Sequence, residues 1–120
     1  ANVGRAVVPA SGWYEWTGQT RSKTRWRISP KNGQPLALAA ITDVWRGPGG
    51  VSVSQLATVT CEPNADVRKY HHRMPVLLTL EAVATWLSED EAEAKAALKV
   101  PEPGALLVEE AKAEMDRFGH

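Results

Sequence analysis

The stretch RWRISPKNG at residues 25–33, followed by LALAAI at residues 36–41, decides the fold class of this chain. Residues 25–28 alternate polar and apolar side chains, as a half-buried strand does, and residues 36–41 form a nearly continuous apolar run. Between them, Pro30 to Gly33 have the composition of a tight turn. Further short runs of strand-forming residues lie at residues 5–8, 13–16 and 51–60. The sequence therefore predicts a mainly antiparallel β-sheet or partial barrel.

Helical patterns replace strand patterns after Pro75. Thr79 can cap a helix whose apolar positions fall on one face, at Leu80, Val83, Ala84 and Leu87. Ser88 begins a Ser-x-x-Glu capping box, which predicts a second helix running to about Leu98. A terminal helix is expected over residues 109–118.

The chain has the length and composition of one globular domain. It has 120 residues, of which 43% are hydrophobic and 23% charged, and this balance excludes wholesale disorder. Because strand patterns come first and helical patterns follow Pro75, the predicted fold class is α+β, with antiparallel strands followed by C-terminal helices. We expect a single domain over residues 1–120, with a β-rich basic part at 1–78 and a helical acidic part at 79–120.

Several classes of protein are excluded by what the sequence lacks. No apolar run approaches the length of a membrane span, and residues 1–5 do not resemble a signal peptide, so a soluble cytoplasmic protein without a membrane partner is expected. The single cysteine, Cys61, cannot form an internal disulfide. With three histidines at 71, 72 and 120 it makes no recognised zinc pattern. We therefore expect no metal and no cofactor.

The formal net charge of zero conceals two different halves. Up to Arg73 there are ten basic and four acidic residues, a net charge of +6, and from Met74 onward the net charge is −6. The basic half includes five cations around Trp26, between Arg21 and Lys31. Cations interleaved with an aromatic residue suit a single strand of nucleic acid. The alternative is a solvated hairpin with scattered charge.

A lone carboxylate sits among large aromatic residues in Gly12-Trp13-Tyr14-Glu15-Trp16. In a strand, Glu15 and Trp13 share one face, while Tyr14 and Trp16 take the other. A carboxylate beside an indole loses solvation, which suits Glu15 to proton transfer. The alternative is an edge strand whose Glu15 is simply solvated.

The second candidate segment is His71-His72-Arg73-Met74-Pro75, just after Arg68-Lys69. In an extended segment, His71 and Arg73 project to one side and His72 to the other. An imidazole beside a guanidinium suits acid/base work next to a phosphate. The alternative is a pair of surface histidines in a loop.

Cys61 could act as a nucleophile paired with His71. It ends the apolar run through Val59, where a buried cysteine more often packs than reacts. We therefore expect a packing role, and a thiol peptidase using Cys61 remains an alternative function.

Four motifs in register resemble the SRAP family, the SOS response-associated peptidases or abasic-site processing proteins. The resemblance runs from about Arg5 to Leu87 and is carried by Arg5-x-x-x-Pro9-Ala10-x-Gly12-Trp13-Tyr14-Glu15-Trp16, Ala39-Ala40-Ile41-x-Asp43-x-Trp45, Thr60-x-x-Pro63-Asn64 and His71-x-Arg73-Met74-Pro75-Val76-Leu77-Leu78. It implies a protein of the SOS response to DNA damage that binds single-stranded DNA at abasic sites. It further implies a thiazolidine crosslink, formed when an N-terminal cysteine traps the deoxyribose aldehyde. Lyase-type activity and an autoproteolytic peptidase (hydrolase) activity are also implied.

The resemblance assigns roles to individual residues. Glu15 and His71 match the family's catalytic glutamate and histidine, and both are implied to handle protons. Arg73 matches the arginine that holds DNA phosphate. We expect further DNA contacts from Trp16, Arg25, Arg27, Arg68 and Lys69.

The chain departs from the family at its N-terminus. Position 1 is Ala rather than Cys, and the family's Cys-Gly-Arg start has no counterpart. The chain is therefore expected to keep the acid/base and phosphate positions without the nucleophile, and a non-catalytic single-stranded DNA-binding module is the alternative. An unpaired sheet edge is also expected, which favours self-association.

Overall fold

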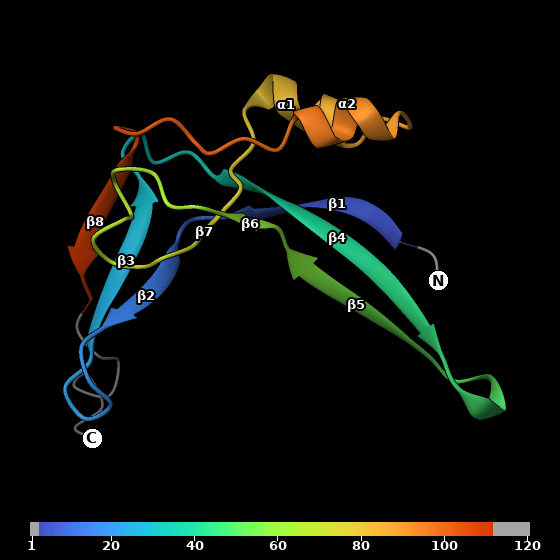
Figure 1. Cartoon of the computed structure of the whole chain (residues 1–120), viewed down its shortest axis with the longest axis horizontal. Helices are drawn as coiled ribbons and strands as arrows, with labels where there is room; N and C mark the ends of the chain where they lie inside the picture. The colour runs from blue at the N-terminus through green and yellow to red at the C-terminus, as the bar shows by residue number, and fades with distance from the viewer. Residues whose placement is uncertain (1–2, 112–120) are drawn as a thin grey trace.

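Antiparallel sheets and two short helices make up the computed structural model, which describes residues 3–111 (Figure 1). One sheet has the order β1-β4-β5 and consists of β1 (Val3–Ala10), β4 (Leu36–Arg46) and β5 (Ser52–Thr58). The other has the order β2-β3-β8 and consists of β2 (Trp13–Thr17), β3 (Thr24–Pro30) and β8 (Leu106–Glu110). A two-stranded ribbon joins β6 (Thr60–Cys61) to β7 (Met74–Pro75). The remaining elements are η1 (Pro48–Gly50), α1 (Leu80–Trp86) and α2 (Glu91–Ala96). The predicted α+β class with mainly antiparallel strands is confirmed.

The turn between β3 and β4 forms where the sequence predicts it. The Gly33 amide donates to the Pro30 carbonyl over 3.2 Å. Gly33 has φ of +72°, a left-handed conformation that glycine adopts without steric cost. The turn sends β4 away from β3 into the other sheet, where it pairs with β1 and β5.

Two clusters of buried side chains form the core. One lies under the helices and contains Ala39, Val76, Leu78, Trp86 and Ala94. The other lies against the second sheet and contains Ile28, Val67, Met74 and Leu106. Cys61 is half-buried and packs against both clusters.

The segment from Met74 to Leu78 connects the two clusters. It runs beside β4, where the Ala39 amide donates to the Val76 carbonyl over 3.1 Å and the Leu78 amide donates to the Ala37 carbonyl over 2.8 Å. Because Met74 belongs to one cluster and Val76 to the other, this segment holds the two sheets in a fixed relation.

Arg5 joins the first strand to the end of helix α1. Its guanidinium donates to the carbonyl oxygens of Trp86 and Ser88, and it lies 5.7 Å from the centroid of the Trp86 ring. In return, the Trp86 indole donates to the Ala6 carbonyl over 2.8 Å. A cation here satisfies carbonyl groups that every helix leaves unpaired at its C-terminus.

The expected terminal helix is wrong at its start, because residues 109 and 110 belong to strand β8. This strand pairs antiparallel with β3, with Val108 opposite Ile28. Its inward positions Leu106 and Val108 pack in the second cluster, and they follow the two-residue period of a strand. The backbone groups of β8 find their hydrogen-bond partners along the edge of β3, so this segment pairs as a strand instead of forming hydrogen bonds within a helix. The acidic part expected at 79–120 is therefore not wholly helical, and residues 112–118 of the expected helix lie outside the described residues.

The first helix is capped as predicted, whereas the second begins later. Thr79 accepts a hydrogen bond from the Ala82 amide over 3.2 Å. Asp90, not Ser88, caps α2, and its carboxylate accepts from the amides of Ala92 and Glu93. Ser88 instead accepts from the Asp90 amide and so supports the cap.

The strand expected over residues 51–60 is divided in two. β5 ends at Thr58, after which the Val59 amide donates to the Ala39 carbonyl and Thr60 pairs with Pro75 in the β6–β7 ribbon. Within residues 3–111, neither helix has the length and apolar composition needed to cross a membrane.

Candidate functional site

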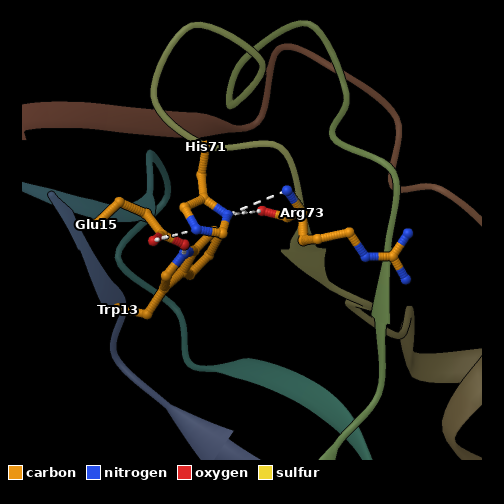
Figure 2. A network of polar contacts seen from close by, with 4 residues as sticks. All are labelled: Trp13, Glu15, His71 and Arg73. Carbon is orange, nitrogen blue, oxygen red and sulfur yellow. Dashed lines mark hydrogen bonds and ion pairs between the residues drawn. The ribbon is translucent and has the colours of Figure 1, made fainter. Parts of the chain in front are cut away.

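Strand β2 presents Glu15 on the face that it shares with Trp13 (Figure 2). The Trp13 indole donates to Glu15 Oε2 over 3.1 Å, and the Glu15 side chain is only 15% exposed. Tyr14 and Trp16 lie on the opposite face, with ring centroids 6.4 Å apart. β2 is an edge strand, as the alternative interpretation requires, but its glutamate is not solvated.

His71 reaches the same face from a loop between β6 and β7. Its Nε2 lies 3.7 Å from Glu15 Oε1, so residues 56 positions apart in the sequence form one pair. This separation is longer than a hydrogen bond and is an ion-pair distance when the imidazole is charged.

The Nδ1 atom of His71 has a hydrogen-bond partner in either protonation state. The Arg73 amide lies 3.1 Å away and can donate to a neutral Nδ1. The Arg73 carbonyl lies 3.0 Å away and can accept from a protonated Nδ1. Neither state leaves Nδ1 without a partner, so the ring can gain and lose a proton without moving.

Residues 71–73 form a bend rather than a strand, so the expected alternation of side chains is wrong here. The rings of His71 and His72 stack with centroids 4.5 Å apart, rather than pointing to opposite sides. The backbone amide and carbonyl of Arg73 both contact Nδ1 of the His71 ring, and these contacts are incompatible with an extended backbone at residues 71–73.

The side chain of Arg73 points away from Glu15 and His71 (Figure 2). Its Nε donates to Thr60 Oγ1 over 3.2 Å and its Nη2 to the Thr60 carbonyl over 2.9 Å. The guanidinium is held in place on β6 while the residue stays exposed. The guanidinium is therefore fixed on β6 and directed away from the Glu15–His71 pair (Figure 2).

The other candidate DNA contacts divide between two surfaces. Arg68 and Lys69 are exposed on the loop that carries His71. Trp16, Arg25 and Arg27 lie on the opposite face of the second sheet from Glu15, because Glu15 pairs with Trp26 whereas Trp16 pairs with Arg25. On this outer face the Arg25 guanidinium lies 4.8 Å from the centroid of the Tyr14 ring. Sequence analysis predicted that all of these residues contact DNA, and the structure places them on two different surfaces.

Two residues of the site carry roles that sequence reasoning missed: Thr60 holds Arg73, and the buried Asn64 organises the loop that leads to His71. Trp13 was expected beside Glu15, and the structure adds the hydrogen bond that it donates. Thr60 and Asn64 lie in the Thr60-x-x-Pro63-Asn64 motif, to which no chemistry was assigned. The signal for Asn64 was present, because asparagine after proline favours a turn closed by its own side chain.

Cys61 lies in β6 opposite Met74, between the two core clusters. Burial raises the pKa of its thiol, against a smaller opposing effect of the Arg73 cation and with a further increase from Glu62. A raised pKa lowers the fraction of reactive thiolate at neutral pH. These features favour the packing role expected for Cys61 over a nucleophilic one.

Among residues 3–111, no three side chains of the His, Cys, Asp and Glu types gather where they could hold a metal ion.

Curated relatives match much of this chain. The abasic site processing protein YoqW of Bacillus subtilis is 33% identical over 85 residues, covering 70% of this chain and 38% of YoqW. The abasic site processing protein HMCES of Xenopus tropicalis is 34% identical over 118 residues, covering 82% of this chain and 35% of HMCES. The chain thus spans less than two fifths of the length of these relatives.

Solved structures share the fold. A crystal structure of a protein from Bacteroides thetaiotaomicron has a TM-score of 0.81 and 25% identity, and the match covers 95% of this chain and 52% of that one. A protein from Bordetella bronchiseptica has a TM-score of 0.79 at 23% identity, over 91% of this chain and 55% of that one. A family model for SOS response associated peptidase matches residues 1–115. The motifs, the fold and this nearly full-length match agree: the chain belongs to the SOS response-associated peptidase (SRAP) family.

Proposed function

We propose that this chain supplies the DNA-binding surface and the proton-transfer pair of a protein that processes abasic sites in single-stranded DNA. The observation that carries the proposal is the pairing of Glu15 with His71 at 3.7 Å, with a partner available to His71 Nδ1 in both protonation states. The names of the relatives YoqW and HMCES support the choice of an abasic site as the target.

The proposed chemistry needs protons moved at each step. The ring-opened deoxyribose presents an aldehyde, to which an amine adds, and loss of water then leaves an imine. A thiol adds across the imine, so that sulfur bonds to carbon and the proton goes to nitrogen, which closes a thiazolidine. In this scheme Glu15 and His71 pass a proton from the anomeric hydroxyl to the ring oxygen when the sugar opens. They then pass the proton lost by the amine nitrogen to the hydroxyl that leaves as water.

The nucleophile of this reaction is a cysteine at the N-terminus, and residue 1 of this chain is alanine. A polypeptide of these 120 residues is therefore expected to bind abasic DNA without becoming linked to it. A version with the family's N-terminal portion restored, so that it begins with Cys-Gly-Arg, is expected to form the covalent product.

The DNA strand must reach two faces of the second sheet if all proposed contacts are used. Arg73, Arg68 and Lys69 lie near the Glu15–His71 pair, whereas Trp16 is 51% exposed on the outer face. β2 is the edge strand between these faces. We infer that nucleotides beside the lesion pass around the edge of β2 and stack on Trp16.

Binding is tested by fluorescence anisotropy with a labelled single-stranded oligonucleotide carrying one abasic site, over a series of salt concentrations. Arg73→Ala is expected to weaken binding and to reduce the slope of log Kd against log salt by about 0.7, the value for one phosphate contact on a single strand. Arg46→Ala is the matched control, because Arg46 is exposed at the far end of β4. Equal slopes for Arg73→Ala and wild type would remove Arg73 from the DNA interface, and equal affinity for duplex DNA would remove the preference for single strands.

Self-association through β5 is a separate proposal. All seven residues of β5 are exposed, and only β4 pairs with it among the described residues. The strand reads SVSQLAT and carries no charge, so two copies can pair along it without like-charge repulsion.

A further inference from the structure

The loop from Asn64 to Arg73 is anchored at both ends, and its anchoring sets where His71 lies. At its start, Asn64 is buried, and its Oδ1 accepts from the amides of Asp66 at 3.0 Å and Val67 at 3.3 Å. Its backbone carbonyl accepts from the amides of Val67 and Arg68. The Asn64 backbone amide donates to Met74 Sδ over 3.2 Å, which ties the start of the loop to β7, the strand that follows the loop.

The same asparagine fastens the loop to a segment far along the chain. Asn64 Nδ2 donates to the carbonyl of Pro101 over 2.9 Å and lies 3.4 Å from that of Glu102. Beside it, Asp66 accepts from the Gly104 amide over 2.7 Å. The segment 101–104 leads directly into β8, and β8 pairs with β3. Asn64 therefore links the His71 loop to the sheet that carries Glu15.

The end of the loop is docked on that sheet by an aromatic contact. The ring of Tyr70 packs against Trp26 with centroids 4.8 Å apart, and the Trp26 indole is fixed by donating to Thr17 Oγ1 over 2.8 Å. Trp26 is the cross-strand partner of Glu15. The residue before His71 thus rests on the residue beside Glu15.

A chain of hydrogen bonds connects Asn64 to His71 through Val67. The Val67 amide bonds to Asn64, and the Val67 carbonyl accepts from the His71 amide over 3.1 Å. Nδ1 of the His71 ring in turn lies within hydrogen-bond distance of the Arg73 amide and carbonyl.

We propose that Asn64 is a positioning residue for the reaction, which acts through His71 by holding the 64–73 loop against the 101–104 segment so that the imidazole faces Glu15. This role rests on the proposed function, because it gives His71 its catalytic meaning. Asn64 itself does not touch the Glu15–His71 pair.

The first test needs no DNA and uses amide hydrogen exchange in the 120-residue chain, read residue by residue by NMR. The Arg73 amide reports on the His71 ring, because it donates to Nδ1. We expect Asn64→Ala to accelerate exchange at Arg73 and His71 roughly tenfold, while the amides of β3 and β4 that pair between strands stay protected. Asn64→Asp keeps an acceptor for the Asp66 and Val67 amides and is expected to restore part of the protection.

Matched variants keep this test decisive. Asn32→Ala removes a similar side-chain contact, from Asn32 Oδ1 to the Gln34 amide, in an exposed turn away from the site, and is expected to leave the Arg73 amide unchanged. If Asn64→Ala does not fold, Asp66→Ala cuts the Gly104 link alone and is expected to accelerate the same amides. Exchange that rises equally in all strands, or an unchanged Arg73 amide in the folded variants, would overturn the positioning role.

The second test measures crosslinking to abasic DNA in the version that begins with Cys-Gly-Arg. Asn64→Ala is expected to slow crosslinking roughly tenfold and to change the Kd for DNA less than about twofold. Combined with His71→Ala, it is expected to add no further slowing, because both changes remove the same function. Additive slowing would contradict action through His71. Absence of crosslinking in the unsubstituted version would count against the proposed function, whereas the exchange result would still decide the placement of His71.

Discussion

At the scale of single residues, the environment of Glu15 depends on one neighbour in its own strand. Trp13 lies two positions earlier, and its indole donates to the carboxylate from the same face of β2. Hydrogen bonds to a charged group contribute more than neutral ones, and Glu15 is mostly withdrawn from solvent. Trp13 thus both shields the carboxylate and orients it toward His71.

Replacing Trp13 by Phe removes the donor and keeps most of the ring. We expect the free energy of unfolding to fall by about 1.5–3 kcal/mol, the usual range for a hydrogen bond to a charged group. Urea denaturation followed by circular dichroism measures the change. Trp16→Phe is the control, since Trp16 is 51% exposed, and its free energy of unfolding should change by less than about 0.5 kcal/mol. Equal losses in the two variants would mean that the indole hydrogen bond to Glu15 contributes nothing.

Cys61 gives a prediction in pH. Burial raises the pKa of its thiol, so the folded protein holds the neutral form to higher pH than a free cysteine does. The rate of alkylation by iodoacetamide, measured by mass spectrometry, should therefore rise with pH at a later point in the folded chain than in the urea-unfolded chain. An earlier rise in the folded chain would indicate an activated thiolate and would revive a nucleophilic role.

At the scale of elements, local sequence patterns predicted several features that depend on near neighbours. The structure contains the strand at β2, the turn at Gly33 and the helix cap at Thr79. Each was predicted from residues close together in the sequence. β8 was missed because its formation depends on the edge of β3, which lies more than seventy positions earlier. The bend at His71 was missed although it is local, because it depends on hydrogen bonds between the His71 ring and the Arg73 backbone that residue types alone do not predict.

The same distinction applies to the candidate site. Sequence reasoning and the family resemblance selected Glu15 and His71, and the fold brings them together. The separation of Trp16, Arg25 and Arg27 from this pair follows from strand alternation and register, which requires knowing that β2 pairs with β3. The turn at Asn64 could have been predicted from its local sequence, but its hydrogen bonds to the carbonyls of Pro101 and Glu102 form only in the folded chain.

Helix α2 gives a prediction at this scale, because it has only six residues and depends on its cap. Asp90→Ala removes an acceptor for two backbone amides and should lower the free energy of unfolding by about 1 kcal/mol. Glu89→Ala, one position earlier, is the control and should have little effect. Thermal and urea unfolding measure both variants, and a silent Asp90→Ala would show that packing alone holds α2.

At the scale of the whole molecule, the chain is more open than a compact domain of its size. Its radius of gyration is 17.0 Å, whereas a compact domain of this length has a value of about 14 Å. The end of the β4–β5 ribbon that leads to η1 extends away from the helices and the second sheet (Figure 1). Exposed apolar residues on it include Ile41, Trp45, Val53 and Leu56. Such a surface favours a partner, and the uncharged edge of β5 favours a second copy of the chain.

Self-association is tested by placing a charge on that edge. Ser54→Lys puts a lysine in the middle of β5, where two paired copies would bring like charges together. We expect wild type to show a mass that rises with concentration in light scattering after gel filtration, and Ser54→Lys to stay monomeric. Ser22→Lys adds the same charge in the exposed turn between β2 and β3 and should behave as wild type. A monomeric wild type at all concentrations would exclude the interface.

The central claim is that Glu15 and His71 move protons during reaction with an abasic site. The most direct test is the rate of covalent product formation on an abasic single-stranded oligonucleotide, resolved on a denaturing gel, for the version that begins with Cys-Gly-Arg. Glu15→Gln and His71→Ala are each expected to slow the reaction by about 100-fold or more while DNA affinity changes little. Arg73→Ala is expected chiefly to weaken binding. Unchanged covalent kinetics in both Glu15→Gln and His71→Ala would contradict the account.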